Sequence, residues 1–215
     1  SRTHKTSRKK KGEFMNKTPH ILLAAGTSKR MGCAKQLLPW NRSTLIEHQI
    51  VTLLKSNQPV YVILGAYSEA IHTIIESYPV EIVICHDWEL GMGNSLAYGL
   101  KQISQKSQKW GGFLISLVDQ PLVNELHFQQ IRDAFKYGNK QIIASESDKG
   151  WVGVPVLFDA FYLEELLLLK GEEGAKKLIH KHKDCLTLIQ GADLLVDMDT
   201  PQMYQNLSQK FSHRS

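Results

Sequence analysis

The strongest constraint on the fold is the regular alternation of short aliphatic runs with amphipathic stretches. The aliphatic runs contain few polar residues, as expected for strands covered on both faces, and they lie at 21–25, 60–64, 80–84, 113–118 and 142–144. Between them, apolar residues recur at helical spacing over 45–54, 68–78 and 126–137. Strands that alternate with helices in this way pair in parallel through right-handed crossovers. The pattern predicts a three-layer α/β fold with a doubly wound, mostly parallel sheet.

Local signals mark the ends of several elements. Thr44 and Glu47 have the spacing of a capping box, which predicts that a helix begins after Thr44. Beyond residue 144 the alternation is less regular, and we predict strands at 154–158 and 194–196 and helices at 162–170, 175–182 and 201–210. Pro201 suits the first turn of the last helix.

The basic charge of the chain is concentrated at its start. The formal net charge is +5, and residues 1–14 carry the whole excess because they hold six Lys and Arg against Glu13 alone. We predict that 1–14 is a disordered basic leader of cloning origin, since Met15 reads as a natural start, and that 15–215 is a single domain. The alternative is a basic arm that binds nucleic acid. With the leader set aside, we expect neither a nucleic acid nor a membrane partner.

The cysteines and the hydropathy indicate the compartment. Cys33, Cys85 and Cys185 are widely spaced and form neither a C-x-x-C pair nor a zinc-binding pattern. No apolar run is long enough for a transmembrane helix. We therefore expect a cytoplasmic protein with reduced thiols.

The loop after the first strand combines glycines with cations. Gly26 and Gly32 allow backbone N–H groups to surround an anion, and Arg30 and Lys35 add full charges for a polyphosphate. A Walker A loop is excluded because Cys33 follows the second glycine, and a G-x-G-x-x-G fingerprint is absent. The alternative is an ordinary strand-to-helix turn with solvated charges.

Residues 23–35 read Leu-Ala-Ala-Gly-x-Ser-x-Arg-Met-Gly-x-x-Lys, which resembles the signature of the MobA-like nucleotidyltransferases. Within that family the chain is most similar to the molybdenum cofactor cytidylyltransferases, because a Leu-Pro-Trp tripeptide follows at 38–40. The resemblance implies a Rossmann-like nucleotidyltransferase fold. It also implies that Arg30 and Lys35 act on the phosphates and that the loop binds nucleotide through Leu23, Ala24, Ala25, Gly26, Thr27, Ser28 and Lys35.

Carboxylates follow two later strands. Asp119 comes directly after 113–118, where a carboxylate can hold Mg²⁺ together with phosphate oxygens. Asp197 and Asp199 point to the same side if their segment is extended. The resemblance implies that Asp119 is catalytic and binds the metal, with Asp199 favoured over Asp197 as the second ligand. The alternative is that these residues form a turn and a helix cap.

Further motifs match the family in the same order along the chain. Residues 91–96 contain Gly-Met-x-x-Ser-Leu, and the resemblance implies that the nucleotide pocket includes Gly65, Gly93, Asn94 and Ser95. Asn94 and Ser95 have the alternative role of capping a helix. On the acceptor side the resemblance implies Gly153 and Pro155. Two departures stand out: Cys85 replaces a frequent Asn, and Val154 replaces a His or Asn that would offer the acceptor a polar contact.

The sequence thus predicts a Mg²⁺-dependent enzyme that transfers CMP from CTP to molybdopterin and releases pyrophosphate. A molybdenum hydroxylase is a further expected partner. One alternative is the same chemistry on a sugar or alditol phosphate. Another is an accessory protein of a molybdenum hydroxylase that binds nucleotide or cofactor without turnover.

Overall fold

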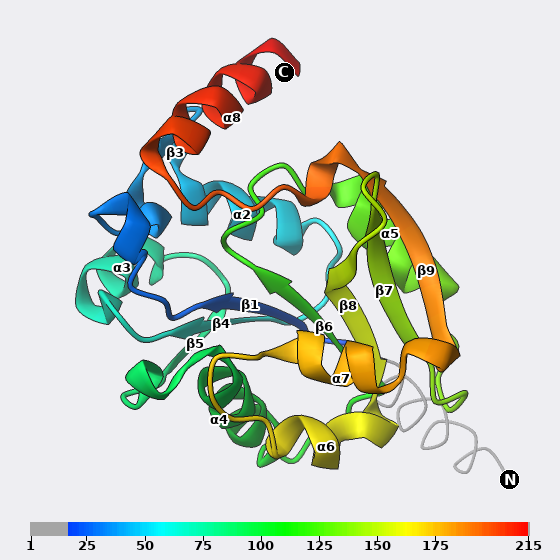
Figure 1. The fold of residues 1–215 in the computed structure, drawn as a ribbon. Coiled ribbons are helices and arrows are strands. Elements are labelled where there is room, and N and C mark those ends of the chain that lie inside the picture. The colour runs from blue at the N-terminus through cyan, green and yellow to red at the C-terminus, as the bar shows by residue number, and fades with distance from the viewer. Residues whose placement is uncertain (1–16, 215) are drawn as a thin grey trace, which may run out of the picture.

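The structure, a computed structural model, describes residues 17–214 and contains one large sheet. The predicted leader at 1–14 lies outside the described residues. Seven strands follow the order β5-β4-β1-β6-β8-β7-β9 across the sheet (Figure 1). Their bounds are β1 His20–Ala24, β4 Val60–Leu64, β5 Glu81–Ile84, β6 Gly112–Leu117, β7 Ile142–Ser147, β8 Val152–Asp159 and β9 Leu186–Ala192.

Within this seven-stranded sheet all strand pairs are parallel except those of β8, which runs antiparallel to both β6 and β7. The register of β1 is central, because Ile21 pairs with Tyr61 on one side and with Ile115 on the other. The predicted mostly parallel, doubly wound sheet is confirmed. Its parallel strands end at one edge, where ligands of such sheets bind.

Helices cover both faces of the sheet and give three layers (Figure 1). Successive residues of β1 face opposite ways, so that Leu22 lies in one apolar cluster and Ile21 in the other. The first cluster is covered by α2 Leu45–Leu54, α3 Ser68–Ile75, α5 Glu125–Ala134 and α8 Pro201–Arg214. The second is covered by α4 Met92–Ser104, α6 Leu163–Leu167 and α7 Ala175–Lys181.

A small β-hairpin directly precedes α2. Its strands are β2 Pro39–Trp40 and β3 Ser43–Thr44, and α2 follows at once. The predicted capping box is present: the Glu47 N–H donates to Thr44 Oγ1 over 3.4 Å and the Thr44 N–H donates to Glu47 Oε2 over 3.0 Å. Within residues 17–214, no helix combines the length and apolarity that crossing a bilayer requires.

The C-terminal third differs from the sequence prediction. Residues 194–196, expected to be a strand, belong largely to a 3-10 turn over Asp193–Leu195 that buries Leu195 against the sheet. The strand of this region is β9, which lies earlier and was not predicted. As an edge strand, β9 is only partly buried and its apolar residues do not form a continuous run.

Candidate nucleotide and metal site

The loop after β1 turns over the carboxyl edge of the sheet, and both its backbone conformation and one buried side chain fix this turn. Ser28 and Gly32 have positive φ angles of 56° and 71°, which turn the chain back toward the sheet. The buried side chain of Gln36 donates its amide to the carbonyl oxygens of Ala24 over 3.0 Å and Gly26 over 3.3 Å. These contacts fix the glycine turn at the point where β1 ends.

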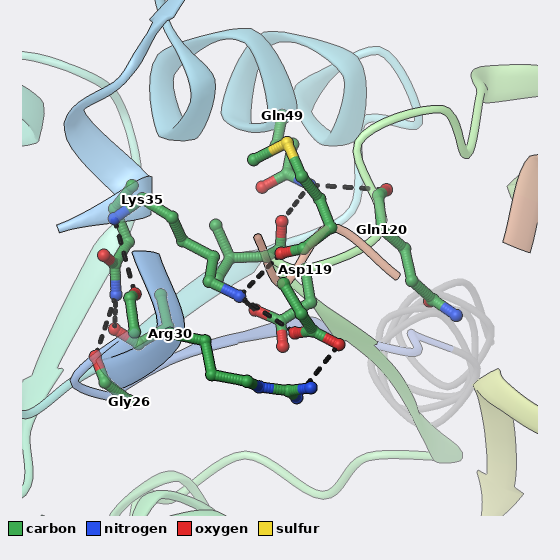
Figure 2. Close-up of polar contacts among 12 residues, drawn as sticks. Gly26, Arg30, Lys35, Gln49, Asp119 and Gln120 are labelled. Atoms are coloured by element: carbon green, nitrogen blue, oxygen red, sulfur yellow. Dashed lines mark hydrogen bonds and ion pairs between the residues drawn. The ribbon is translucent and has the colours of Figure 1, made fainter. Parts of the chain in front are cut away.

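Lys35 lies at the centre of the site and contacts two carboxylates, those of Asp119 and Asp199 (Figure 2). Its ammonium is 3.2 Å from Asp119 Oδ1 and 3.2 Å from Asp199 Oδ1. It also donates to the Met198 carbonyl oxygen over 2.7 Å. The side chain is only 6% exposed, so that one desolvated cation balances two anions.

Arg30 contacts Asp199 from the solvent-exposed side of the site. Its guanidinium is 3.3 Å from Asp199 Oδ2 and its side chain is 72% exposed. An exposed guanidinium can exchange this carboxylate for a phosphate, to which it binds with similar geometry. The loop therefore presents one buried and one exposed cation to the same space.

Asp119 and Asp199 come from segments far apart in sequence that meet at the sheet edge. Asp119 follows β6, and the chain reaches Asp199 by crossing back from the end of β9. The Met198 N–H donates to the Asp119 carbonyl oxygen over 2.8 Å, which joins the two segments directly. The sequence prediction that these carboxylates lie beside the glycine turn agrees with this geometry.

Burial and mutual repulsion raise the pKa values of two carboxylates of the site, Asp119 and Asp197. Burial raises the pKa of Asp119, an effect that Lys35 opposes and Asp199 reinforces. The pKa of Asp197 is raised to about 6, first by partial loss of hydration and then by the negative charges of Asp119 and Asp199. Asp197 is exposed and does not line the cavity, whereas Asp199 does. The geometry therefore favours Asp199 as the second ligand.

A cavity of about 550 Å³ opens over these residues. Its size suits a nucleotide. Of the residues predicted to bind nucleotide or act on it, those that line the cavity are Leu23, Ala24, Ala25, Gly26, Thr27, Ser28, Arg30, Lys35, Ser95, Asp119 and Asp199.

Three predicted pocket residues do not line the cavity and instead pack its walls. Gly65 lies so close to the Trp88 side chain that a Cβ would collide with it. Gly93 donates its N–H to the Gly171 carbonyl oxygen over 2.8 Å. Asn94 donates to the Asp87 carbonyl oxygen over 2.9 Å and is not the N-cap of α4, which is Gly91. The small size and polarity that suggested ligand contact serve close packing here.

Sequence reasoning also missed several residues of the cavity wall. The additional lining residues are Lys29, Gln36, Trp88, Glu89, Gly91, Met92, Leu117, Val118 and Glu172. Most of them lie within or directly beside the motifs that were recognised, such as Lys29 in 23–35 and Gly91 and Met92 in 91–96. Glu172 is distant in sequence, and its loop reaches the cavity because Gly171 packs against Gly91 at the start of α4.

The predicted acceptor residues lie on the other side of Asp119. Gly153 and Pro155 belong to β8, whose first residues lie at the carboxyl edge because β8 is antiparallel to β6. Neither lines the nucleotide cavity. The Gly153 position is next to the half-exposed ring of Trp151.

The carboxylates of Asp119 and Asp199 fit a divalent metal that takes its remaining ligands from phosphate oxygens and water. The Lys35 ammonium shows that one small cation can contact Asp119 and Asp199 together. Within residues 17–214, no group of three or more His, Cys, Asp and Glu side chains could hold a metal ion. Mg²⁺ commonly uses one or two carboxylates and takes its other oxygens from water and phosphates.

The sheet, the glycine turn and the paired carboxylates at its edge define a nucleotide-binding α/β protein. The comparison with known families then identifies it: the profile of the MobA-like NTP transferase domain matches residues 20–185, and the chain belongs to this family.

Two relatives match over nearly their full lengths. Nicotine blue oxidoreductase of Paenarthrobacter nicotinovorans is 32% identical, and the alignment covers 87% of this chain and 95% of the relative. Purine catabolism protein PucB of Bacillus subtilis is 27% identical, with 89% and 96% covered.

A solved structure is similar throughout the described fold. Rv0371c of Mycobacterium tuberculosis superposes with a TM-score of 0.78 and 25% identity, covering 90% of this chain and 99% of that one. A second structure of Rv0371c, in complex with manganese, gives a TM-score of 0.76 at 23% identity, covering 91% and 99%.

Proposed function

We propose that this protein is a Mg²⁺-dependent nucleotidyltransferase that transfers CMP from CTP to molybdopterin and releases pyrophosphate. The observation that carries the proposal is the contact of one buried ammonium, Lys35, with both Asp119 and Asp199 beside the glycine turn. Membership of the NTP transferase family supports the reaction class. The complex of Rv0371c with manganese supports use of a divalent metal.

The cavity would receive CTP with its triphosphate on the turn from Gly26 to Gly32. Arg30 is exposed enough to leave Asp199 and bind the phosphates that leave as pyrophosphate. Lys35 is anchored at the carboxylates and would stabilise negative charge near the α-phosphate. Removing a preorganised contact of this kind costs on the order of 10²–10³ in rate.

Asp119 and Asp199 would hold the metal, which supplies positive charge to the phosphate oxygens when bound. A terminal phosphate oxygen of the acceptor would attack the α-phosphorus in line, forming one P–O bond as the bond to pyrophosphate breaks. Because this nucleophile is already an anion, no general base is required. The contribution of the chain is to position the reactants and stabilise charge.

The identity of the acceptor rests on family resemblance and on β8. Val154 offers the acceptor no polar side chain, and Gly153 and Pro155 contribute shape and backbone groups. The same chemistry on a sugar or alditol phosphate is therefore the nearest alternative. An accessory protein that binds the cofactor for a molybdenum hydroxylase without turnover is the second. In either case we expect a cytoplasmic location.

A pyrophosphate-release assay tests the proposal. CTP, GTP and ATP are each compared with molybdopterin, with sugar phosphates and without acceptor. We expect release with CTP and molybdopterin, its loss in Asp119→Ala, and its retention in Asp133→Ala, where an exposed aspartate is removed from α5. Release with sugar phosphates alone would change the acceptor, and no release under any condition would favour the accessory role.

One relative is named as an oxidoreductase, so a redox activity should be tested alongside pyrophosphate release. Nicotine blue oxidoreductase shares 32% identity with this chain. This chain lacks the G-x-G-x-x-G turn that binds dinucleotides in many oxidoreductases. We therefore expect no oxidation of NADH or NADPH above background. Turnover of either dinucleotide in the absence of pyrophosphate release would reject the transferase proposal.

A further inference from the structure

Gln120, the residue after Asp119, is buried beneath the site. It is 3% exposed and is not part of the cavity wall. Its side-chain amide donates to the Val154 carbonyl oxygen over 3.0 Å and to the Leu195 carbonyl oxygen over 3.3 Å. One amide group thus joins the Asp119 loop to β8 and to the segment that leads to Asp199.

Gln49 supports the same loop from α2 (Figure 2). It is 8% exposed, and its amide donates to the Val118 carbonyl oxygen over 3.0 Å and reaches that of Gln120 at 3.5 Å. The carbonyl oxygen between these two, that of Asp119, accepts from the Met198 N–H over 2.8 Å. Three consecutive carbonyl groups around Asp119 therefore have identified donors.

These bonds replace the sheet ladder at the point where it ends. β6 stops at Leu117, and its last contact with β1 is the Val118 N–H, which donates to the Leu23 carbonyl oxygen over 3.2 Å; the backbone that follows around Asp119 is largely buried. Buried carbonyl groups require donors. Here the Gln49 amide donates to the Val118 carbonyl oxygen and shares that of Gln120 with the Val123 N–H, which is 3.4 Å away. The spacing of Asp119 and Asp199 then depends on Gln49 and Gln120 as well as on the groups that touch both carboxylates.

We propose that Gln49 and Gln120 are positioning residues that set the spacing of Asp119 and Asp199 and so determine the affinity of the site for a divalent metal. The inference rests on the proposed function, because it takes these carboxylates as the metal ligands. Outer-shell residues of this kind typically contribute 10- to 100-fold to metal affinity.

The test is Mn²⁺ binding measured by electron paramagnetic resonance with a non-hydrolysable CTP analogue present. Gln120→Met keeps the length of the side chain and removes its donor. The matched control is Gln141→Met, because Gln141 also donates its amide to a backbone carbonyl, that of Ala134, but precedes β7 at the opposite edge of the sheet. We expect Mn²⁺ affinity to fall about tenfold or more in Gln120→Met and to stay at the wild-type value in the control.

A thermodynamic cycle separates positioning from general loss of structure. In an Asp199→Asn background, Gln120→Met should have little further effect on Mn²⁺ affinity, because the second carboxylate is already absent. Equal losses in both backgrounds would overturn the inference. If Gln120→Met does not fold, Gln49→Met serves in the same cycle with the same expected direction.

The outcomes also separate this inference from the proposed function. Wild-type Mn²⁺ affinity in both Gln120→Met and Gln49→Met, together with pyrophosphate release by the wild type, would refute the inference alone. Weakened Mn²⁺ binding in the variants, with no pyrophosphate release by the wild type, would refute the transferase activity and retain the inference. Absence of Mn²⁺ binding by the wild type would overturn both.

Discussion

Replacing Lys35 by Met would remove the cation that balances Asp119 and Asp199 while keeping the length of the side chain. Each contact is 3.2 Å long. At this separation a gross attraction of about 5 kcal/mol per carboxylate follows for an effective dielectric constant of about 20. The cost of burying the ammonium offsets most of this gain.

Removing Lys35 nevertheless leaves the two carboxylates facing each other without their cation, and loss of one partner of a buried ion pair costs about 3–5 kcal/mol. For a chain of this size such a loss lowers Tm by about 6–20 °C. The affinity of the site for a divalent metal should increase in Lys35→Met, although stability falls. Lys35 no longer competes for the carboxylates, and a gain of about 1.4 kcal/mol would tighten Mn²⁺ binding tenfold.

The assay combines thermal unfolding with Mn²⁺ titration in the absence of nucleotide, followed by pyrophosphate release. We expect Lys35→Met to be less stable, to recover stability when saturated with Mn²⁺, and to be nearly inactive. Lys106→Met is the control, because Lys106 pairs with Glu81 at an exposed position remote from the site and such pairs contribute less than about 1 kcal/mol. Unchanged stability together with unchanged or weaker Mn²⁺ binding in Lys35→Met would refute this reasoning.

Three further variants test other parts of the site. The raised pKa of Asp197, about 6, means that its ionised form is disfavoured in the fold, so Asp197→Asn should exceed wild type in stability above pH 6. We expect a gain of about 1 kcal/mol, because exposure of the side chain screens the effect, and its disappearance by pH 4; a constant difference in urea unfolding across this range would contradict the assignment. Gly91 has a φ angle of 110° and faces the Gly171 carbonyl, so Gly91→Ala should lose about 2–3 kcal/mol, and wild-type stability in urea unfolding would show that the strain is absent. Arg30→Ala should lower pyrophosphate release about 10²-fold while changing stability by less than about 1 kcal/mol; retained activity would remove Arg30 from the phosphate site.

Much of the fold follows from the sequence because the central strands β1, β4 and β6 are buried on both faces. Their aliphatic runs, and the Thr44 capping box, are local signals that the tertiary structure keeps. β9 was missed because polar residues interrupt its apolar sequence, whereas β5, the strand at the other side of the sheet, has a continuous apolar run. The run at 194–196 was misread because Leu195 fills space beside Gly191 from a turn, which periodicity does not distinguish from a short strand.

The residues of the site also fall into two groups, those that the sequence predicts and those whose roles depend on distant segments. Residues whose backbone or charge faces the cavity, such as Gly26 and Lys35, belong to a contiguous motif with a physical reason for each member. Gln120 directly follows the predicted Asp119, yet its role depends on Val154 and Leu195, which come from other segments. Polarity alone also does not separate Ser95, which lines the cavity, from Asn94, which stabilises a turn. Such assignments require the three-dimensional neighbours.

The central claim is that Asp119 and Asp199 hold a divalent metal against the triphosphate of a nucleotide on the glycine turn. A crystal structure with Mn²⁺ and a non-hydrolysable CTP analogue, using the anomalous signal of manganese, tests it most directly. We predict an anomalous peak between the two carboxylates, in contact with phosphate oxygens above Gly26. A peak bound elsewhere, or a triphosphate on another face of the molecule, would contradict the account.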